Sequence, residues 1–276
     1  MPKKKKIRKK YKNQKSKIKK KIQSRKNSNE LIYKVKKEWV KKATVNKSAY
    51  EKKYSSSIKD NDSFWRKEGK RITWIKPYTK IKDVKYSKSD VNIKWYYDGT
   101  LNASSNCIDR HLKKNKDKTA IIWVGDDPKI SKKISYKQLH QEVSKAANGL
   151  KDLGVKKGDR VTIYLTMIPE LAYTMLACAR IGAIHSIIFG GFSPDSIAGR
   201  INDCKSDYVV TADEGVRGGK KIPLKSITDE ALVSCPKVKK CIVVKRTGNR
   251  INWDESRDVW YHKITKKASA DCPPEE

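Results

Sequence analysis

The 276-residue sequence has no long hydrophobic run and few acidic residues. A membrane-spanning helix needs about 18 or more consecutive apolar residues, and no such stretch is present. The N-terminus carries positive charge without the apolar core of a secretory signal. These absences exclude a membrane-spanning protein and a standard secreted one, and we expect a cytoplasmic protein. Only 30 Asp and Glu oppose 65 Lys and Arg, which leaves a formal net charge of +35.

Several signatures of metal, redox and nucleotide chemistry are also missing. The six cysteines include no CxxC pair, and the four histidines include no HExxH pair. Because zinc and redox sites use such close pairs, the sequence predicts no metal site and predicts free thiols in a reducing compartment. No GxxxxGK[ST], GxGxxG or GxSxG motif is present, and no nucleophile lies beside a base. We therefore expect no catalytic residue in this chain.

The positive charge is concentrated at the N-terminus. Residues 1–42 contain 20 Lys and Arg and 2 acids, a net charge of +18, and the remaining residues contain 45 and 28, a net charge of +17. Like charges and few apolar residues predict a Lys-rich tail without a core of its own. Three interpretations stay open: a solvated tail, a polybasic arm that binds nucleic acid or anionic lipid, and a start codon assigned too far upstream.

Residues 43–105 form a second region that is rich in aromatic side chains. The pattern indicates short helices followed by extended chain on both sides of Pro77. Aromatic rings among lysines can stack on single-stranded nucleic acid. The alternative is a small cap whose rings are used in packing, and this is the alternative that we favour.

From residue 106 to residue 276 the sequence alternates between strand and helix patterns. The spacing of apolar residues predicts a helix over 135–154. Pro and Gly mark the starts and ends of the helices in this region. This alternation favours an α/β fold with a doubly wound, largely parallel sheet. The expected strands are 119–125, 159–165, 183–189, 207–213 and 239–246, and the later helices are 169–182, 193–204, 227–235 and 258–268. Strand 183–189 is almost continuously apolar, which predicts burial on both of its faces.

Ligands of such sheets bind where the strands end, and two strand ends are candidates. Gly190 and Gly191 follow strand 183–189 and precede a helix whose N-terminus is suited to an anion. Arg217, Gly218, Gly219 and Lys220 follow strand 207–213, and cations beside flexible backbone are suited to phosphate. For each, the alternative is an ordinary connection or a solvated basic loop.

Long segments of the sequence resemble AMP-forming acetyl-CoA synthetases, the acetate–CoA ligases of the adenylate-forming enzymes. These segments include VNIKWYYDGTLNASSNCIDRHL, LACARIGAIHSIIFGGFSPDSIAGRI, TADEGVRGGKKIPLK and VVKRTGNRINWDESRDVWYH. The resemblance runs from about residue 43 to residue 276. It implies that 43–105 is the N-terminal cap of this family and that 106–276 is an incomplete AMP-binding domain.

The resemblance also implies substrates, cofactors and site residues. Acetate would attack ATP with Mg²⁺ assistance to give acetyl-adenylate and pyrophosphate, and the thiol of CoA would then release acetyl-CoA and AMP. In the family, the loop that matches Arg217, Gly218, Gly219 and Lys220 contacts the nucleotide end of CoA, and the turn at Gly190 and Gly191 lines the same region. The family usually has Arg where this chain has Lys220, which keeps the charge and loses the bidentate geometry.

The sequence ends at DCPPEE, shortly before the Gly/Ser/Thr-rich phosphate loop of the family would begin. We therefore expect an N-terminal part that is inactive alone, with at most a partial CoA site and an unpaired strand edge. One alternative is a non-catalytic remnant or binding module that uses the partial CoA site or binds nucleic acid through its tail. Another is a propionate-specific relative.

Overall fold

The computed structural model describes residues 33–276, which divide into two compact units, one up to Asn61 and one from Asp62 onward. In the first unit, helices α2 (Lys37–Lys42) and α3 (Lys47–Lys59) bury no residue. The Asn46 side chain begins α3 by accepting a hydrogen bond from the amide of Ala49. The proposed polybasic arm falls largely on residues 1–32, outside the described residues.

The second unit begins with a segment whose aromatic rings pack on one another. It contains all of α4 (Asn61–Glu68) except its first residue, the 3₁₀ turn η2 (Gly69–Arg71) and the antiparallel hairpin of β1 (Lys82–Tyr86) and β2 (Val91–Trp95). The ring centroids of Trp74, Tyr78 and Tyr96 lie 4.6–5.5 Å apart. These three rings are thus used in packing within the segment.

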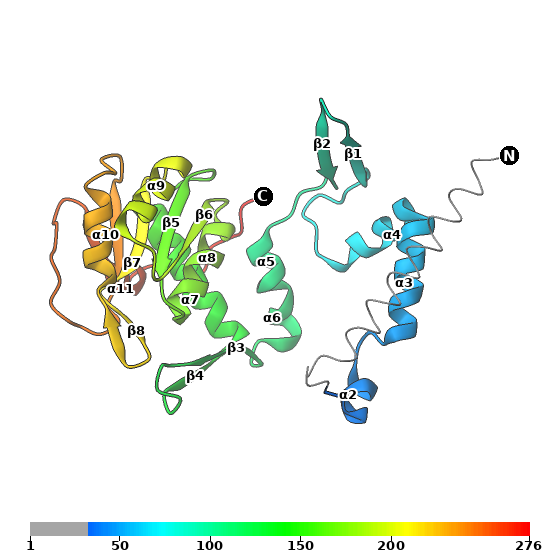
Figure 1. Ribbon diagram of the computed structural model, residues 1–276, viewed down its shortest axis with the longest axis horizontal. Helices are drawn as coiled ribbons and strands as arrows, with labels where there is room; N and C mark the ends of the chain where they lie inside the picture. The colour runs from blue at the N-terminus through cyan, green and yellow to red at the C-terminus, as the bar shows by residue number, and fades with distance from the viewer. Residues whose placement is uncertain (1–32) are drawn as a thin grey trace, which may run out of the picture. The chain divides into compact units, whose positions relative to one another are not determined.

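The rest of the second unit is built on a five-stranded parallel sheet in the order β11-β10-β7-β5-β6. Figure 1 labels β5, β6 and β7 of this sheet. This is the α/β, largely parallel fold that the alternating pattern predicts. The strands are β5 (Arg160–Leu165), β6 (Ile184–Phe189), β7 (Tyr208–Ala212), β10 (Lys240–Val244) and β11 (Asp258–Trp260). The helices are α5 (Ala103–Cys107), α6 (Asp109–Asn115), α7 (Tyr136–Asp152), α8 (Pro169–Arg180), α9 (Pro194–Cys204), α10 (Leu224–Leu232) and α11 (Tyr261–Lys266).

The helices form two groups, which is what double winding requires. Helix α7 packs against α8 and α11, whereas α9 packs against α10. The chain passes from β5 to β6 on one side and then back across β5 to β7 and β10 on the other. Since parallel crossovers are right-handed, this reversal places the connecting helices α8 and α9 on opposite faces of the sheet.

The helix boundaries follow from local chemistry. Ser135 and Gln138 form a reciprocal capping box at the start of α7. Pro169 and Pro194 occupy the first turns of α8 and α9, and the Ser193 side chain caps α9. Gly154 follows α7 with a φ of +96°, a backbone conformation that favours glycine.

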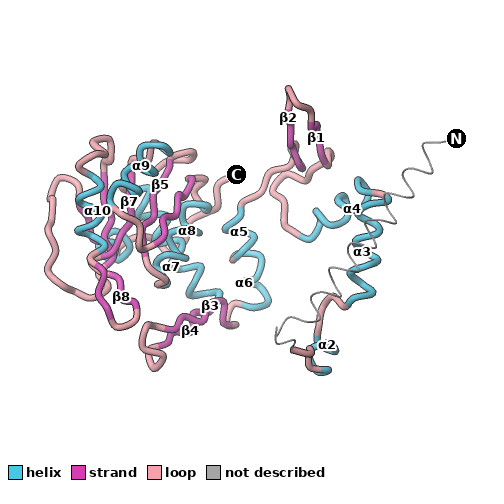
Figure 2. The backbone as a smooth tube through the Cα atoms, in the orientation of Figure 1, coloured by secondary structure: helices cyan, strands magenta, loops and turns pink. Residues whose placement is uncertain are grey.

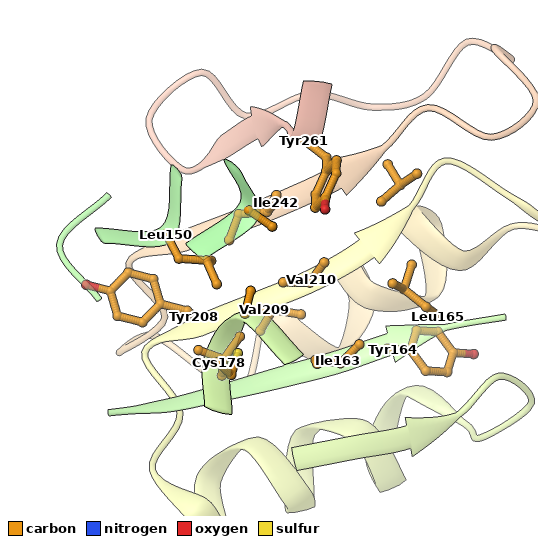
Figure 3. Close-up of a cluster of buried hydrophobic side chains, with 14 of the residues drawn as sticks. Leu150, Ile163, Tyr164, Leu165, Cys178, Tyr208, Val209, Val210, Ile242 and Tyr261 are labelled. Atoms are coloured by element: carbon orange, nitrogen blue, oxygen red, sulfur yellow. The ribbon is translucent and has the colours of Figure 1, made fainter. Parts of the chain in front are cut away.

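The hydrophobic core lies on the central strands β5, β7 and β10. All five residues of β7 are buried, and Ile163, Val209 and Ile242 expose no surface (Figure 3). Burying such a side chain stabilises the fold by about 1.5–3 kcal/mol. The central strands therefore fix the position of their carboxyl ends, where the candidate site lies.

Strand β6 is an edge strand with exposed apolar side chains, and the prediction that it is buried on both faces is wrong. Its only strand partner among the described residues is β5. Ile184, Ile187 and Phe189 are 55%, 44% and 57% exposed. An apolar run shows that a strand can be buried, but it does not show whether a neighbouring helix or strand covers it. Among the described residues, β6 and β11 are the two edge strands of this sheet.

Three further segments differ from the predicted pattern. The predicted strand 119–125 is β3 (Thr119–Val124), but it pairs with β4 (Ser131–Ser135) in a separate antiparallel hairpin. The predicted helix 258–268 begins as the short strand β11 and becomes helical only at Tyr261. The basic loop after β7 is a hairpin of β8 (Gly215–Arg217) and β9 (Lys220–Ile222).

Candidate functional site

The candidate site lies at the carboxyl ends of β5, β6 and β7. Strands β5 and β7 are neighbours, but the connection after β5 leads to β6 and the connection after β7 leads to β10 on the opposite side. Adjacent strands whose connections diverge leave a crevice at their carboxyl ends, which is where α/β sheets bind ligands. The residues after β5 and β7, Thr166 and Asp213, stand at this position.

A hairpin, labelled β8 in Figure 2, follows the end of β7. It carries two of the predicted cations, Arg217 and Lys220. Arg217 and Lys220 are directly opposite in the register of β8 and β9, so their side chains emerge on one face of the hairpin. The turn between them is Gly218–Gly219, with φ values of +58° and +73°. Positive φ at both central residues is the pattern of a type I′ turn, for which two glycines are suited.

A cavity of about 530 Å³ lies between this hairpin and the ends of β5 and β6. Its lining is largely apolar, and Arg217 is its only cationic side chain. The lining residues are Leu165, Thr166, Met167, Leu171, Ile187, Ile188, Phe189, Gly190, Val216 and Arg217. The Arg217 guanidinium carbon lies 5.8 Å from the centroid of the Phe189 ring, so the positive charge lies over an aromatic ring of the cavity lining.

The structure brings together some of the predicted site residues and not others. Gly190 and Arg217 line the same cavity, whereas Gly191 is exposed in the turn that leads to α9. Lys220 lies beside Arg217 on the hairpin, outside the lining. Lys221 extends on the other face and forms an ion pair with Glu214 at 3.6 Å.

The backbone amides of Gly218 and Gly219 are already hydrogen-bonded. Each donates to one carboxylate oxygen of Asp126, at 2.7 Å in both cases. Asp126 lies in the turn between β3 and β4, about 90 residues earlier in the chain. The positive groups that remain for a phosphate are therefore the side chains of Arg217 and Lys220.

Close packing at Gly215 places the hairpin on the sheet. An added Cβ at Gly215 would lie 2.5 Å from Cγ2 of Thr166, a distance that real Cβ atoms do not adopt. Glycine is thus required here for close backbone approach, not for its conformation. Neither Gly215 nor Thr166 is among the site residues predicted from the sequence, although Gly215 lies only two residues after the end of the predicted strand 207–213.

A buried carboxylate organises the neighbouring loop after β10. The Asp213 side chain accepts hydrogen bonds from the amides of Arg246, Thr247 and Gly248 at 2.7–3.2 Å. Next to it, a hydrogen bond from the Thr247 hydroxyl holds the pKa of Glu214 below its usual range. These carboxylates are committed to fixing a loop, and we assign them no chemistry.

Buried titratable groups elsewhere have structural partners or are inert. Burial raises the pKa of the Cys178 and Cys241 thiols to about 12 in each case. Lys225 pairs with Asp229 and Asp258 at 2.7 Å each. Among residues 33–276, no group of three or more His, Cys, Asp and Glu side chains is arranged to hold a metal ion. In that same range, no helix is long and apolar enough to cross a bilayer.

Two family descriptions match the chain in adjacent blocks. Residues 50–107 match the family described as "Acetyl-coenzyme A synthetase N-terminus", and residues 108–276 match the family described as "AMP-binding enzyme". The second block alone covers more than half of the chain.

Two similar proteins are named acetyl-coenzyme A synthetase. The one from Parvibaculum lavamentivorans is 62% identical over 245 residues, and the one from Methylocella silvestris is 57% identical over 246 residues. In both cases the match covers 89% of this chain and 38% of the relative. The chain thus spans well under half the length of the curated relatives that it matches.

A solved structure supports the fold. The acetoacetyl-CoA synthetase from Streptomyces lividans superimposes with a TM-score of 0.71 at 22% identity, over 80% of this chain and 33% of that chain. At this identity the likeness concerns the fold alone. Taken with the two family matches, it shows that the chain belongs to the AMP-binding enzyme family and corresponds to the N-terminal region of the acetyl-coenzyme A synthetases.

Proposed function

We propose that this chain is the N-terminal part of an acetate–CoA ligase and that it supplies part of the surface that receives coenzyme A. The observation that carries the proposal is the cavity at the ends of β5 and β6, with Arg217 at its mouth. The similarity to acetyl-coenzyme A synthetases supports it independently. The free thiols of the described residues suit a reducing compartment such as the cytoplasm.

The site offers two kinds of surface, which correspond to the two chemical parts of coenzyme A. Arg217 and Lys220 lie side by side and can both face a phosphate. Leu165, Ile187 and Val216 offer apolar walls that suit the methylene-rich arm. Because lysine is a compact point charge, Lys220 contributes attraction without the bidentate geometry of an arginine.

In the complete enzyme, acetate would attack the α-phosphate of ATP to form acetyl-adenylate and pyrophosphate. The thiolate of CoA would then attack the carbonyl carbon and release AMP. We assign no step of this first reaction to residues 33–276. The proposed role of this chain is to bind and orient the second substrate.

The proposal is tested by calorimetric titration of the 276-residue chain with CoA. We expect Arg217→Ala to weaken CoA binding about tenfold, the effect of one charge-assisted contact. Arg200→Ala is the matched control, because Arg200 also lies over an aromatic ring, that of Phe192 at 4.9 Å, but does not line the cavity. Pantetheine, which has no nucleotide, should bind both variants equally. Equal CoA affinity of the two variants would refute the assignment of Arg217.

A further inference from the structure

We propose that Asp126 is a positioning residue for the phosphate contact, because it holds the turn that presents Arg217 and Lys220. The inference rests on the proposed coenzyme A site and deepens it. Its basis is the pair of 2.7 Å hydrogen bonds from Gly218 and Gly219 to the two oxygens of one carboxylate. Both bonds are charge-assisted and therefore stronger than bonds between neutral groups.

The hairpin cannot fix its own tip. Strands β8 and β9 have three residues each, and isolated two-stranded hairpins of ordinary length are only marginally stable in water. The four residues from Arg217 to Lys220 are exposed, and two of them are glycines, which lose more conformational freedom on ordering than other residues. At its base the hairpin is held by the close approach of Gly215 to Thr166 and by the ion pair of Lys221 with Glu214. At the tip, the Arg217 side chain lies over the Phe189 ring, and the turn amides of Gly218 and Gly219 are held by Asp126.

Asp126 is well placed for this task because its own turn is ordered from within. The amide of Gly125 donates to the carbonyl of Ile130 at 2.7 Å, and the Asp127 side chain accepts from the amide of Lys129 at 2.9 Å. The preceding strand is tied to the end of β5 by a hydrogen bond from Nε1 of Trp123 to the Met167 carbonyl, at 2.8 Å. Asp126 therefore connects the tip of the hairpin to the same strand end that lines the cavity.

The arrangement also decides which groups of the hairpin meet the phosphate. Successive backbone amides in a turn can themselves form an anion site. Here a carboxylate of the protein occupies that position, so an incoming phosphate contacts the side chains of Arg217 and Lys220 and not the turn amides. The opposite outcome is that phosphate displaces Asp126 from the amides, in which case Asp126 would compete with the ligand and its removal would tighten binding.

Calorimetric titration with CoA separates the two outcomes. We expect Asp126→Ala to raise the Kd for CoA about fivefold, the lower range of couplings between sites. Asp126→Asn, which keeps an acceptor oxygen, should recover part of the loss. Asp117→Ala is the matched control, because it removes one exposed carboxylate at the opposite end of β3. A Kd that falls in Asp126→Ala, or that changes equally in Asp117→Ala, would overturn the proposal.

Hydrogen–deuterium exchange of the ligand-free chain gives a readout that does not depend on CoA. In Asp126→Ala, the peptide that covers residues 215–222 should exchange faster, while peptides from β5 and β7 keep their protection. Unchanged exchange at the hairpin would refute the role of Asp126 even if CoA binds. If the wild-type chain does not bind CoA, the proposed site fails, and faster exchange in Asp126→Ala would still show that Asp126 holds the turn.

Discussion

Replacing Lys225 should destabilise the fold more than the loss of an ordinary lysine. Its side chain is 1% exposed, and its ammonium lies 2.7 Å from both Asp229 and Asp258. The Asp258 side chain is completely buried. Removing one member of a buried ion pair typically costs about 3–5 kcal/mol, because the remaining charge is left without compensation.

The structure indicates that the loss lies near the lower end of this range. In Lys225→Met, Asp258 keeps a hydrogen bond from Nε of Arg257 at 2.9 Å and one from the amide of Asp254 at 3.0 Å. We therefore expect a loss of about 3 kcal/mol in the free energy of unfolding. For a unit of this size, that loss lowers Tm by roughly 6–12 °C, since each kcal/mol shifts Tm by about 2–4 °C.

Urea denaturation followed by circular dichroism measures the loss. Lys239→Met is the matched control: Lys239 lies 2.7 Å from Asp207, but it is 64% exposed, and a surface pair contributes at most about 1 kcal/mol. The double variant Lys225→Met with Asp258→Asn should be less destabilised than the sum of the single variants, because the second change removes the uncompensated charge. Equal losses in the Lys225 and Lys239 variants, or strict additivity, would refute the reasoning.

Three further predictions follow from individual sites. Gly215→Ala should destabilise the hairpin and weaken CoA binding, because the added Cβ collides with Thr166. Gly199→Ala should instead stabilise α9 by about 0.5–1 kcal/mol, because no atom lies within 4 Å of an added Cβ there. Urea denaturation measures both changes in the free energy of unfolding. Burial raises the pKa of Cys178 to about 12, so its thiol stays protonated in the native state at pH 9 while exposed Cys107 reacts with Ellman's reagent. Because the unfolded thiol ionises first, Cys178 also makes stability fall as pH rises above about 9, and early modification of Cys178 would contradict both statements. Residues 1–276 alone should give no acetate-dependent ATP–pyrophosphate exchange, and measurable exchange would show that this region contains the adenylation machinery.

Local chemistry made the helices and the central strands predictable from the sequence. Ser135, Pro169 and Ser193 signal helix starts with a mechanism that needs no distant partner. The apolar runs of β5 and β6 are alike in sequence, yet one strand lies in the interior of the sheet and the other at its edge. Burial depends on the neighbour that covers a strand, and no local pattern reports that neighbour.

The candidate site was predictable in part for the same reason. The cations and glycines after β7 could be recognised from their position at a strand end. Gly218 and Gly219 favour a flexible loop by composition alone, although two glycines between short extended segments also indicate a hairpin. Asp126 could not be found in this way, because its role depends on a contact between residues that lie about 90 positions apart.

The exposed edge of β6 links the colloidal behaviour of the protein to ionic strength. Within residues 33–276, no strand pairs with the outer edge of β6, and its backbone groups beside Ile184 and Ile187 form a template for strand addition. The net charge of +35 makes copies of the chain repel one another, and this repulsion has a range of about 10 Å at 0.1 M salt and about 3 Å at 1 M. Salt therefore weakens the force that keeps two edges apart while it leaves the apolar attraction between them intact. Dilute buffer should favour dispersed molecules, and concentrated salt should favour edge-to-edge assembly.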